Sequence, residues 1–348
     1  MPSNTIEKGS HVLVTGVTGF IATHVANQLL KAGYRVTGTA RSQAKADAVQ
    51  TLFADYGSDK FKILITGDLE KEGAFDEAVK DVDAIAHTAS PVTFNPEDPI
   101  RDVVNPAING TISLLHSAHK YGKNVKHVVI TSSVVSVASR DIDHPYTFTE
   151  KDWNEGAYEK IRHWKKGDPV DGSISYAASK TEAEKALWKF QKDESPKFTI
   201  NAILPAVCIG RIIPAPKSAA EVSGSPGIIA VFYTGKVDLT AGNGQMPYVN
   251  VEDVALAHVR AIERGSETSG ERFILSADTY DPQQIVDILR KHYPERKEII
   301  PEGTPGKYPP HDQTFDGSKA TKALGIQYKD LETSLVEFSD SVKHVFDL

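Results

Sequence analysis

Hydrophobic residues along the chain fall into short runs that alternate with segments of helical spacing. Six short apolar runs predict strands, at residues 11–15, 34–39, 61–65, 82–87, 127–131 and 198–204. Segments between them, with apolar positions three and four residues apart, predict helices at residues 23–31, 74–80, 100–121 and 176–191. This alternation is typical of a parallel sheet covered on both faces by helices. The sequence therefore predicts an α/β fold with a doubly wound, Rossmann-type parallel sheet.

The pattern changes after residue 205. Residues 210–247 are rich in Gly, Pro and Ser and show little periodicity, which is typical of a substrate loop or lid. Further on we expect a helix capped by Asp253 and running to Ile262, a returning strand at 272–275, and helices at 282–293 and 331–346. The predicted organisation is an NADP-binding domain over residues 1–205, joined by a strand and a helix returning from about 249–277, and a smaller, mainly substrate-binding region over 206–348.

Composition and charge narrow the range of partners. The chain has 348 residues, of which 40% are hydrophobic, and a formal net charge of -7 without a basic cluster, which argues against nucleic acid. A single cysteine, Cys208, excludes an intramolecular disulfide, and twelve histidines without ligand spacing predict no metal site. No apolar run has the length of a membrane span or the form of a signal peptide. We expect a cytoplasmic protein with a small-molecule partner and no membrane contact, either a monomer or a homodimer.

A turn with two glycines joins the first predicted strand to the first predicted helix, in the sequence Thr-Gly-Val-Thr-Gly-Phe-Ile-Ala at 15–22. Gly16 allows a sharp turn, and Gly19 allows the backbone to approach a pyrophosphate that faces the free N–H groups of the helix. Ala22 stands where a third glycine is common, and it still permits close packing of helix on strand. We predict a dinucleotide site with contacts from residues Gly16, Thr18, Gly19, Phe20 and Ile21.

The end of the second predicted strand indicates which dinucleotide is bound. An acidic residue there would bind the ribose hydroxyls of NAD, but the chain has Arg41, and Lys45 follows one turn later. Both cations can neutralise a 2′-phosphate, and Arg41 can also stack on the adenine, so the sequence predicts NADP(H). The alternative is that they are two solvated surface charges. After strands three and four, further contacts to adenine and ribose are expected from Asp68, Leu69, Thr88 and Ser90.

Three residues form a candidate acid–base constellation. Tyr176 and Lys180 are four residues apart on a predicted helix and therefore share one face. An ammonium close to a phenol favours the phenolate, so we expect Lys180 to lower the pKa of Tyr176 toward neutrality. Ser133 follows the fifth strand in the sequence Thr131-Ser132-Ser133, at the same sheet edge, and its hydroxyl can donate to a developing alkoxide.

Together these motifs resemble the extended short-chain dehydrogenase/reductase family, and within it the yeast NADPH-dependent carbonyl (methylglyoxal) reductases and the plant dihydroflavonol reductases. The resemblance covers nearly the whole chain, and it rests on residues 14–21, 38–42, 87–91, 131–133, 176–184 and 248–255. It implies that Ser133, Tyr176 and Lys180 are catalytic, with Asn109 holding a proton-relay water. It also implies further cofactor contacts from Thr131, Pro205, Cys208 and Ser225.

The resemblance implies that NADPH reduces aldehydes or ketones to alcohols while Tyr176 donates the proton. Residues 211–245 match the family poorly, and substrate preference would be set there. A cleft lined by residues Phe94, Val134, Trp164 and Gln245 is our expectation for the substrate site. Two other functions stay open. One is an NADP-binding redox sensor without turnover, and the other is a nucleotide-sugar epimerase or dehydratase on the same scaffold, which would normally prefer NAD.

Overall fold

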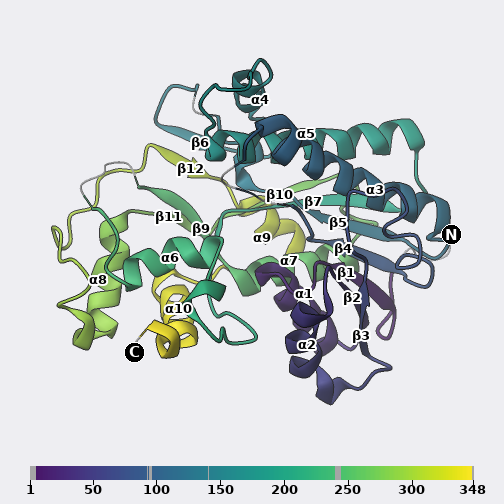
Figure 1. The fold of residues 1–348 in the computed structure, drawn as a ribbon, viewed down its shortest axis with the longest axis horizontal. Helices are drawn as coiled ribbons and strands as arrows, with labels where there is room; N and C mark the ends of the chain where they lie inside the picture. The colour runs from purple at the N-terminus through teal and green to yellow at the C-terminus, as the bar shows by residue number, and fades with distance from the viewer. Residues whose placement is uncertain (1–4, 92, 94–95, 140, 240–243, 347–348) are drawn as a thin grey trace.

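A computed structural model describes residues 5–346 apart from 92, 94–95, 140 and 240–243. Its centre is a seven-stranded sheet in the order β10-β7-β5-β4-β1-β2-β3, with every neighbouring pair parallel. The strands are β1 (His11–Thr15), β2 (Arg35–Ala40), β3 (Phe61–Ile65), β4 (Ala84–His87), β5 (His127–Thr131), β7 (Thr199–Pro205) and β10 (Arg272–Leu275). The predicted doubly wound sheet is confirmed, and Figure 1 shows it in the right half of the molecule.

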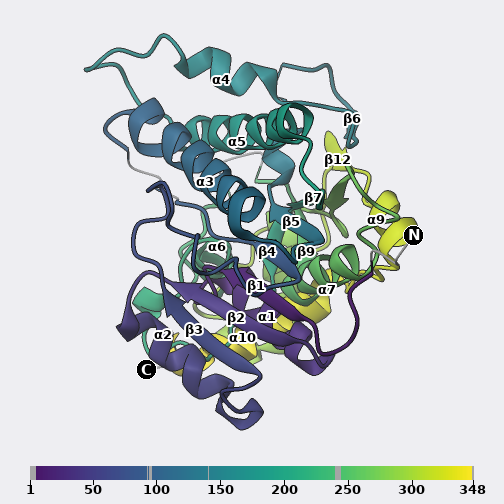
Figure 2. The same cartoon turned by 90° about the vertical axis from the view of Figure 1, so that its right-hand side faces the viewer.

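Helices cover both faces of this sheet, as Figure 2 shows. On one face α1 (Phe20–Lys31) packs against α7 (Val251–Glu263), and on the other α3 (Asn105–Tyr121) packs against α5 (Gly172–Glu194). A short helix, α2 (Gln43–Leu52), packs beside β2 and β3. The chain order reverses between β1 and β4, and this switch point is where open α/β sheets bind ligands.

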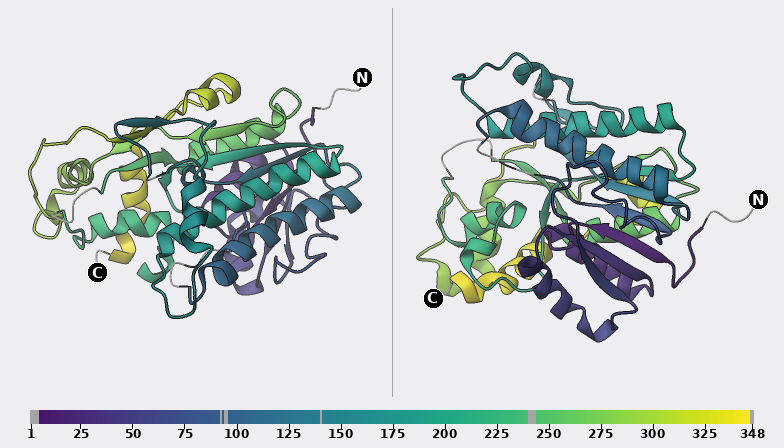
Figure 3. Two further views of the ribbon diagram at one scale, coloured as in Figure 1. Left: turned by 90° about the horizontal axis from the view of Figure 1, so that it is seen from above. Right: turned by 45° about the vertical axis from the view of Figure 1, so that its right-hand side comes forward.

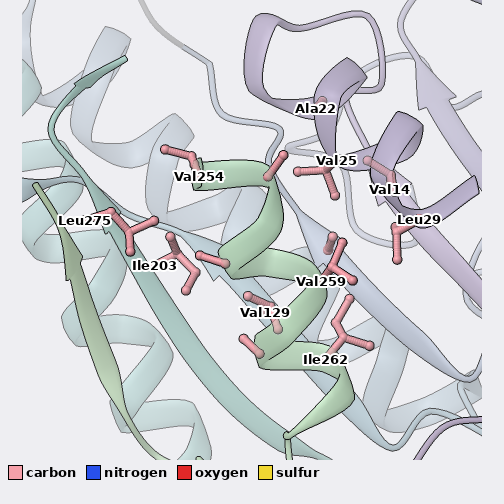
Figure 4. Close-up of a cluster of buried hydrophobic side chains, with 14 of the residues drawn as sticks. Val14, Ala22, Val25, Leu29, Val129, Ile203, Val254, Val259, Ile262 and Leu275 are labelled. Atoms are coloured by element: carbon pink, nitrogen blue, oxygen red, sulfur yellow. The ribbon is translucent and has the colours of Figure 1, made fainter. Parts of the chain in front are cut away.

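The core beneath α7 explains why the chain returns to the sheet after residue 250. Val254, Val259 and Ile262 recur at helical spacing on α7 and are fully or almost fully buried. They pack on sheet residues such as Val129 and Ile203, as Figure 4 shows. This burial removes an otherwise exposed apolar face from water and joins α7 and β10 to the first part of the chain.

A second apolar core lies beside the sheet, and the green and yellow segments that build it stay together in both views of Figure 3. It combines the sheet β11-β9-β8 with three helices. Its elements are β8 (Val207–Ile209), α6 (Ser225–Tyr233), β9 (Met246–Asn250), β11 (Asp278–Tyr280), α8 (Pro282–His292) and α10 (Leu331–Phe346). The remaining small elements are β6 (Tyr146–Phe148), α4 (Glu155–Ile161), β12 (Gln313–Phe315) and α9 (Ser318–Leu324).

Several sequence expectations need correction. Residues 74–80 form successive turns instead of a helix. Phe75 and Val79 are buried, but the backbone hydrogen bonds of the segment span three as well as four residues. The cap of α7 is Asn250, whose Oδ1 accepts the Glu252 N–H at 2.8 Å, whereas Asp253 lies inside the first turn. The lid segment contains a helix, α6, which the sequence pattern did not predict.

Helix α5 also begins earlier than expected. The Asp171 side chain accepts the N–H groups of Ser173 and Ile174 and caps a helix that starts at Gly172. Tyr176 therefore stands in its second turn, within regular helix. In the described part of the chain, no helix combines the length and the apolar character that crossing a membrane requires.

Candidate active site

A large groove of about 1140 Å³ runs along the carboxyl ends of β1 to β4. Its other wall is the segment from Ile212 to Pro226, which precedes and begins α6. The groove therefore lies at the switch point of the sheet, where the sequence predicted the dinucleotide. Ten of the predicted cofactor contacts line it: Gly16, Thr18, Gly19, Phe20, Arg41, Lys45, Asp68, Leu69, Thr88 and Ser90.

The turn after β1 shows why two glycines are needed there. Gly16 has a φ of +66°, and a Cβ at this position would come within 3.0 Å of the Ala89 side chain. The turn is fixed to β2 because the Val17 N–H donates to the Thr39 carbonyl at 2.9 Å. No side chain caps α1 at Gly19, so the first N–H groups of the helix are available to an anion in the groove.

Ile21 and Ala22, at the start of α1, pack against the protein core. Ala22 is buried, which confirms that alanine fits the place of a third glycine. Ile21 packs against the main core and is not among the residues that line the groove. The structure therefore does not place Ile21 on the groove wall, where the sequence predicted a cofactor contact.

Arg41 and Lys45 stand at the end of the groove beside β2 and α2, which is where we expect the adenine of a dinucleotide and which we call the adenine end. Arg41 ends the turn after β2, Lys45 lies in the first turn of α2, and both side chains are exposed. Within the described residues neither cation forms an ion pair, so both charges are available to a ligand. Their placement fits a 2′-phosphate, and a groove of this volume has room for a whole dinucleotide.

The lid side of the groove adds a cation that sequence analysis missed. Lys217 lines the groove opposite the glycine turn. Ser223 and Pro226 also line it, whereas the predicted contact Ser225 starts α6 between them. Because the segment lacks periodicity, nothing in the sequence pattern distinguished Lys217 from other surface lysines.

Three hydrogen bonds hold this lid segment to helices α1 and α10. His24 Nε2 donates to the Arg211 carbonyl at 2.8 Å, and the Ile212 N–H donates to Ser341 Oγ at 3.1 Å. His344 Nε2 donates to the Pro216 carbonyl at 2.7 Å. The lid is thus fixed through its backbone, which leaves its side chains free to face the groove.

The candidate catalytic residues meet at the end of β5. Ser133 follows β5 and hydrogen-bonds the Tyr176 hydroxyl, which α5 carries above the same sheet edge. The Lys180 ammonium lies 5.8 Å from the centre of the Tyr176 ring. Ser133 and Lys180 are each 8% exposed, while Tyr176 keeps partial access to solvent, as a group that meets a substrate must.

Burial sets the pKa values of this constellation. It raises the pKa of Tyr176 to about 12, opposed by the Ser133 hydrogen bond, and it lowers the pKa of Lys180 to about 8, opposed by the Glu184 carboxylate. The expected lowering of the Tyr176 pKa is not found, because desolvation by burial is the largest influence on this group. At neutral pH Tyr176 is a neutral phenol, which is the form that can donate a proton.

A small cavity of about 20 Å³ lies beside Lys180, and it adjoins the large groove, since Ala89 and Ser90 line both. The predicted contact Thr131 lines it, together with His87 and Thr111. Asn109 is exposed on α3 and is not among the residues that line either cavity. The structure thus does not bring Asn109 against Lys180, and Thr111 is the α3 residue that lies there.

The remaining predicted contacts, Cys208 and Pro205, are buried and are not among the residues that line the groove. Cys208 is buried close to Tyr176, and burial raises the pKa of its thiol to about 12. Its Sγ donates to the Ala206 carbonyl at 3.4 Å, which makes it a packing residue instead of a nucleophile. Pro205 ends β7 and is buried.

The expected substrate residues are not brought together. Val134 is buried directly after Ser133, and Trp164 Nε1 donates to the Asp168 carbonyl in the loop after α4. Gln245 donates to the carbonyls of Pro309 and Pro310 at 3.2 Å each. Phe94 lies outside the described residues. In the described residues, three or more metal-ligating side chains nowhere cluster.

The parallel sheet, the glycine turn and the groove define a Rossmann-type dinucleotide-binding protein. The model of the NAD dependent epimerase/dehydratase family matches residues 12–275, and the chain belongs to this family. The match agrees with the resemblance to extended short-chain dehydrogenases/reductases that the motifs indicated.

Two reductases are similar over almost the entire length. NADPH-dependent methylglyoxal reductase GRE2 of Saccharomyces cerevisiae is 34% identical over 95% of this chain and 97% of its own. Aldehyde reductase 2 of Sporidiobolus salmonicolor is 35% identical over 92% of this chain and 90% of its own. The crystal structure of yeast Gre2 with NADPH matches with a TM-score of 0.84 and 32% identity over 96% of this chain and 98% of that one.

Proposed function

We propose that this protein is an NADPH-dependent reductase that converts small aldehydes and ketones to alcohols. The observation that carries the proposal is the neutral Tyr176 phenol, hydrogen-bonded to Ser133 and placed beside Lys180. These residues lie at the carboxyl end of β5, in the sheet whose strands β1 to β4 border the groove. A redox sensor without turnover has no need of an acid at this position.

The cofactor would be held along the groove by groups of matching charge. The uncapped start of α1 suits the pyrophosphate, and Arg41 with Lys45 suits a 2′-phosphate. Lys217 adds a third cation from the lid side. The chemistry that the bound cofactor supplies is a hydride.

The side chains of the protein then complete the reduction. Tyr176 donates its proton to the carbonyl oxygen, and the Ser133 hydroxyl hydrogen-bonds that oxygen as negative charge develops on it. The Lys180 ammonium supports the Tyr176 phenolate that remains and binds the nicotinamide ribose. The activities for which GRE2 and aldehyde reductase 2 are named support carbonyl compounds as the substrate class.

The proposal is tested by the fall in NADPH absorbance with purified protein and a small dicarbonyl, an aryl ketone and a β-keto ester. We expect oxidation of NADPH with at least one carbonyl, well above the rate with NADH. Equal rates with both nucleotides would contradict the role of Arg41 and Lys45. No oxidation of either, despite NADPH binding, would refute the reductase.

An epimerase or dehydratase is the second candidate, because the matching family is described by those activities. Such an enzyme recycles its cofactor within each turnover and retains it tightly. Release of the nucleotide during purification, together with stoichiometric NADPH consumption, would exclude it for this chain. The presence of Arg41 at the end of β2 already disfavours NAD.

A further inference from the structure

A buried carboxylate lies directly behind the candidate catalytic residues. Glu184 stands one helical turn after Lys180 on α5, and its side chain is 1% exposed. Two hydroxyls donate to its Oε2, those of Ser132 at 2.5 Å and Ser136 at 2.8 Å. A carboxylate that is withdrawn from water in this way is stable only with full hydrogen bonding and a compensating charge.

Arg272 of β10 provides that charge from 88 residues further along the chain. Its Nε donates to Glu184 Oε1 at 2.5 Å, and the pair is buried on both sides. Nη1 of Arg272 also donates to the carbonyls of Glu150 and Asp152, and the guanidinium stacks on the Trp153 ring at 3.7 Å. A cation held by so many contacts fixes the position of the Glu184 carboxylate.

The same carboxylate reaches both elements that carry the candidate catalytic groups. On β5 it accepts from Ser132, the residue before Ser133. On α5 it lies with Lys180 on the wall of the 20 Å³ cavity. Its negative charge acts on the ammonium and opposes the desolvation that lowers the pKa of Lys180 to about 8.

We propose that Glu184 is a positioning residue for carbonyl reduction, which orients the end of β5 beneath Ser133 and keeps the Lys180 ammonium charged. This inference rests on the proposed function. Glu184 does not touch the groove that holds cofactor, so its effect passes through Ser133 and Lys180.

The other titratable groups around Lys180 do not replace this charge. His87 of β4 lines the same cavity, but burial lowers its pKa to about 3, so it is neutral. Tyr176 and Cys208 of β8 are neutral as well, because burial raises both pKa values to about 12. Glu155 of α4 pairs with Lys185 on the outer side of α5. Glu184 is therefore the anion that faces Lys180 among these groups.

The sign of the expected pH effect follows from these charges. Reduction requires the ammonium form of Lys180, so the rate falls as pH rises through its pKa. Glu184→Gln keeps the size of the side chain but removes its charge, and it replaces one acceptor oxygen by an NH2 donor, from which a serine hydroxyl can accept. The pKa of Lys180 then falls further, and the alkaline decline of the rate begins at lower pH.

The experiment compares pH profiles of kcat from pH 6 to 10 at saturating NADPH. In Glu184→Gln we expect the alkaline limb to move to lower pH by about one pH unit. In Glu184→Asp, which retains the charge, and in Ser136→Ala, which removes only one hydroxyl, we expect the limb to stay at its wild-type position. A Glu184→Gln profile that is lowered uniformly, with the limb unmoved, would show a merely structural role and overturn the proposal.

A second variant guards against misfolding. Glu184→Gln leaves Arg272 without its anion, whereas the double variant Glu184→Gln/Arg272→Met removes both charges and avoids an unpaired buried cation. In the double variant we expect the limb to move in the same direction but by less, because removal of the Arg272 cation partly offsets the loss of the Glu184 anion. A limb at its wild-type position in both variants would refute the charge effect. Tyr176→Phe distinguishes the proposed function from the proposed role of Glu184. Full turnover by Tyr176→Phe would refute Tyr176 as the acid, whereas the role of Glu184 is judged separately from the pH profile of Glu184→Gln.

Discussion

The two ends of the site differ in whether their charged side chains are exposed or buried. At the adenine end Arg41 and Lys45 are exposed and carry no ion pair within the described residues. At the catalytic end Lys180 and Glu184 are buried, and Glu184 is neutralised by Arg272. Exposed charges are screened by salt and suit reversible binding, whereas buried charges change the pKa values of their neighbours. The difference indicates that the first end governs affinity and the second governs rate.

The largest effect is expected at the buried end. Tyr176→Phe removes the proton donor and keeps the ring, so kcat should fall by roughly 100- to 10,000-fold. Binding of NADPH, followed by the change in its fluorescence, should be almost unchanged. Loss of binding together with rate would show that the two ends are not separable in this way.

The next effect is expected at the open end. Arg41→Glu should raise KM for NADPH roughly 10- to 100-fold, because a charge-assisted hydrogen bond to the 2′-phosphate is replaced by repulsion. KM for NADH should change little. Lys60→Glu, an exposed lysine away from the groove, gives the same change in net charge and serves as the control. If both variants behaved alike, the effect would be one of overall charge.

Substitution of Gly38, which packs closely against Val17 of the glycine turn, should lower the stability of the fold. A Cβ on Gly38 of β2 would lie 2.5 Å from Val17 Cγ1, so Gly38→Ala should destabilise the fold by about 1–3 kcal/mol. Gly110→Ala is the matched control, since its Cβ meets only Pro91 at 4.0 Å and alanine favours the interior of α3. Thermal unfolding of both variants tests this, and equal melting temperatures would contradict it.

The smallest effect is expected from the lid. His344→Ala removes the hydrogen bond to the Pro216 carbonyl, a loss of about 0.5–1.5 kcal/mol. If the lid forms a wall of the cofactor site, KM for NADPH should rise roughly two- to tenfold. His344→Gln retains a donor and should recover part of this loss. An unchanged KM in His344→Ala would show that the anchor does not contribute to binding.

The sheet and the glycine turn were predicted correctly, because both depend on features within a few residues. Strands show as short apolar runs, and a backbone φ of +66° at position 16 favours glycine. The cap of α7 was assigned three residues late, since Asn250 and Asp253 are both good capping residues and only the backbone path distinguishes them. The prediction of a helix at 74–80 was wrong although the buried residues Phe75 and Val79 have helical spacing, because the backbone hydrogen bonds of this segment run over three as well as four residues.

Long-range contacts account for most of what the sequence did not predict at the site. The pKa of Tyr176 depends on its burial, and a spacing of four residues to Lys180 carries no information about that. Glu184 and Arg272 meet across 88 residues, and His344 reaches Pro216 across 128. Such pairs become visible only when the fold places β10 and α10 beside the first part of the chain.

Hydride transfer from NADPH to a carbonyl carbon is the step on which the proposed function depends. It is tested most directly by incubating the protein with a small ketone and NADPH that carries deuterium at both C4 positions, and measuring the product by mass spectrometry. We expect an alcohol with one deuterium on the carbinol carbon, formed in step with NADPH loss. An unchanged ketone with bound NADPH, or an alcohol without deuterium, would contradict it.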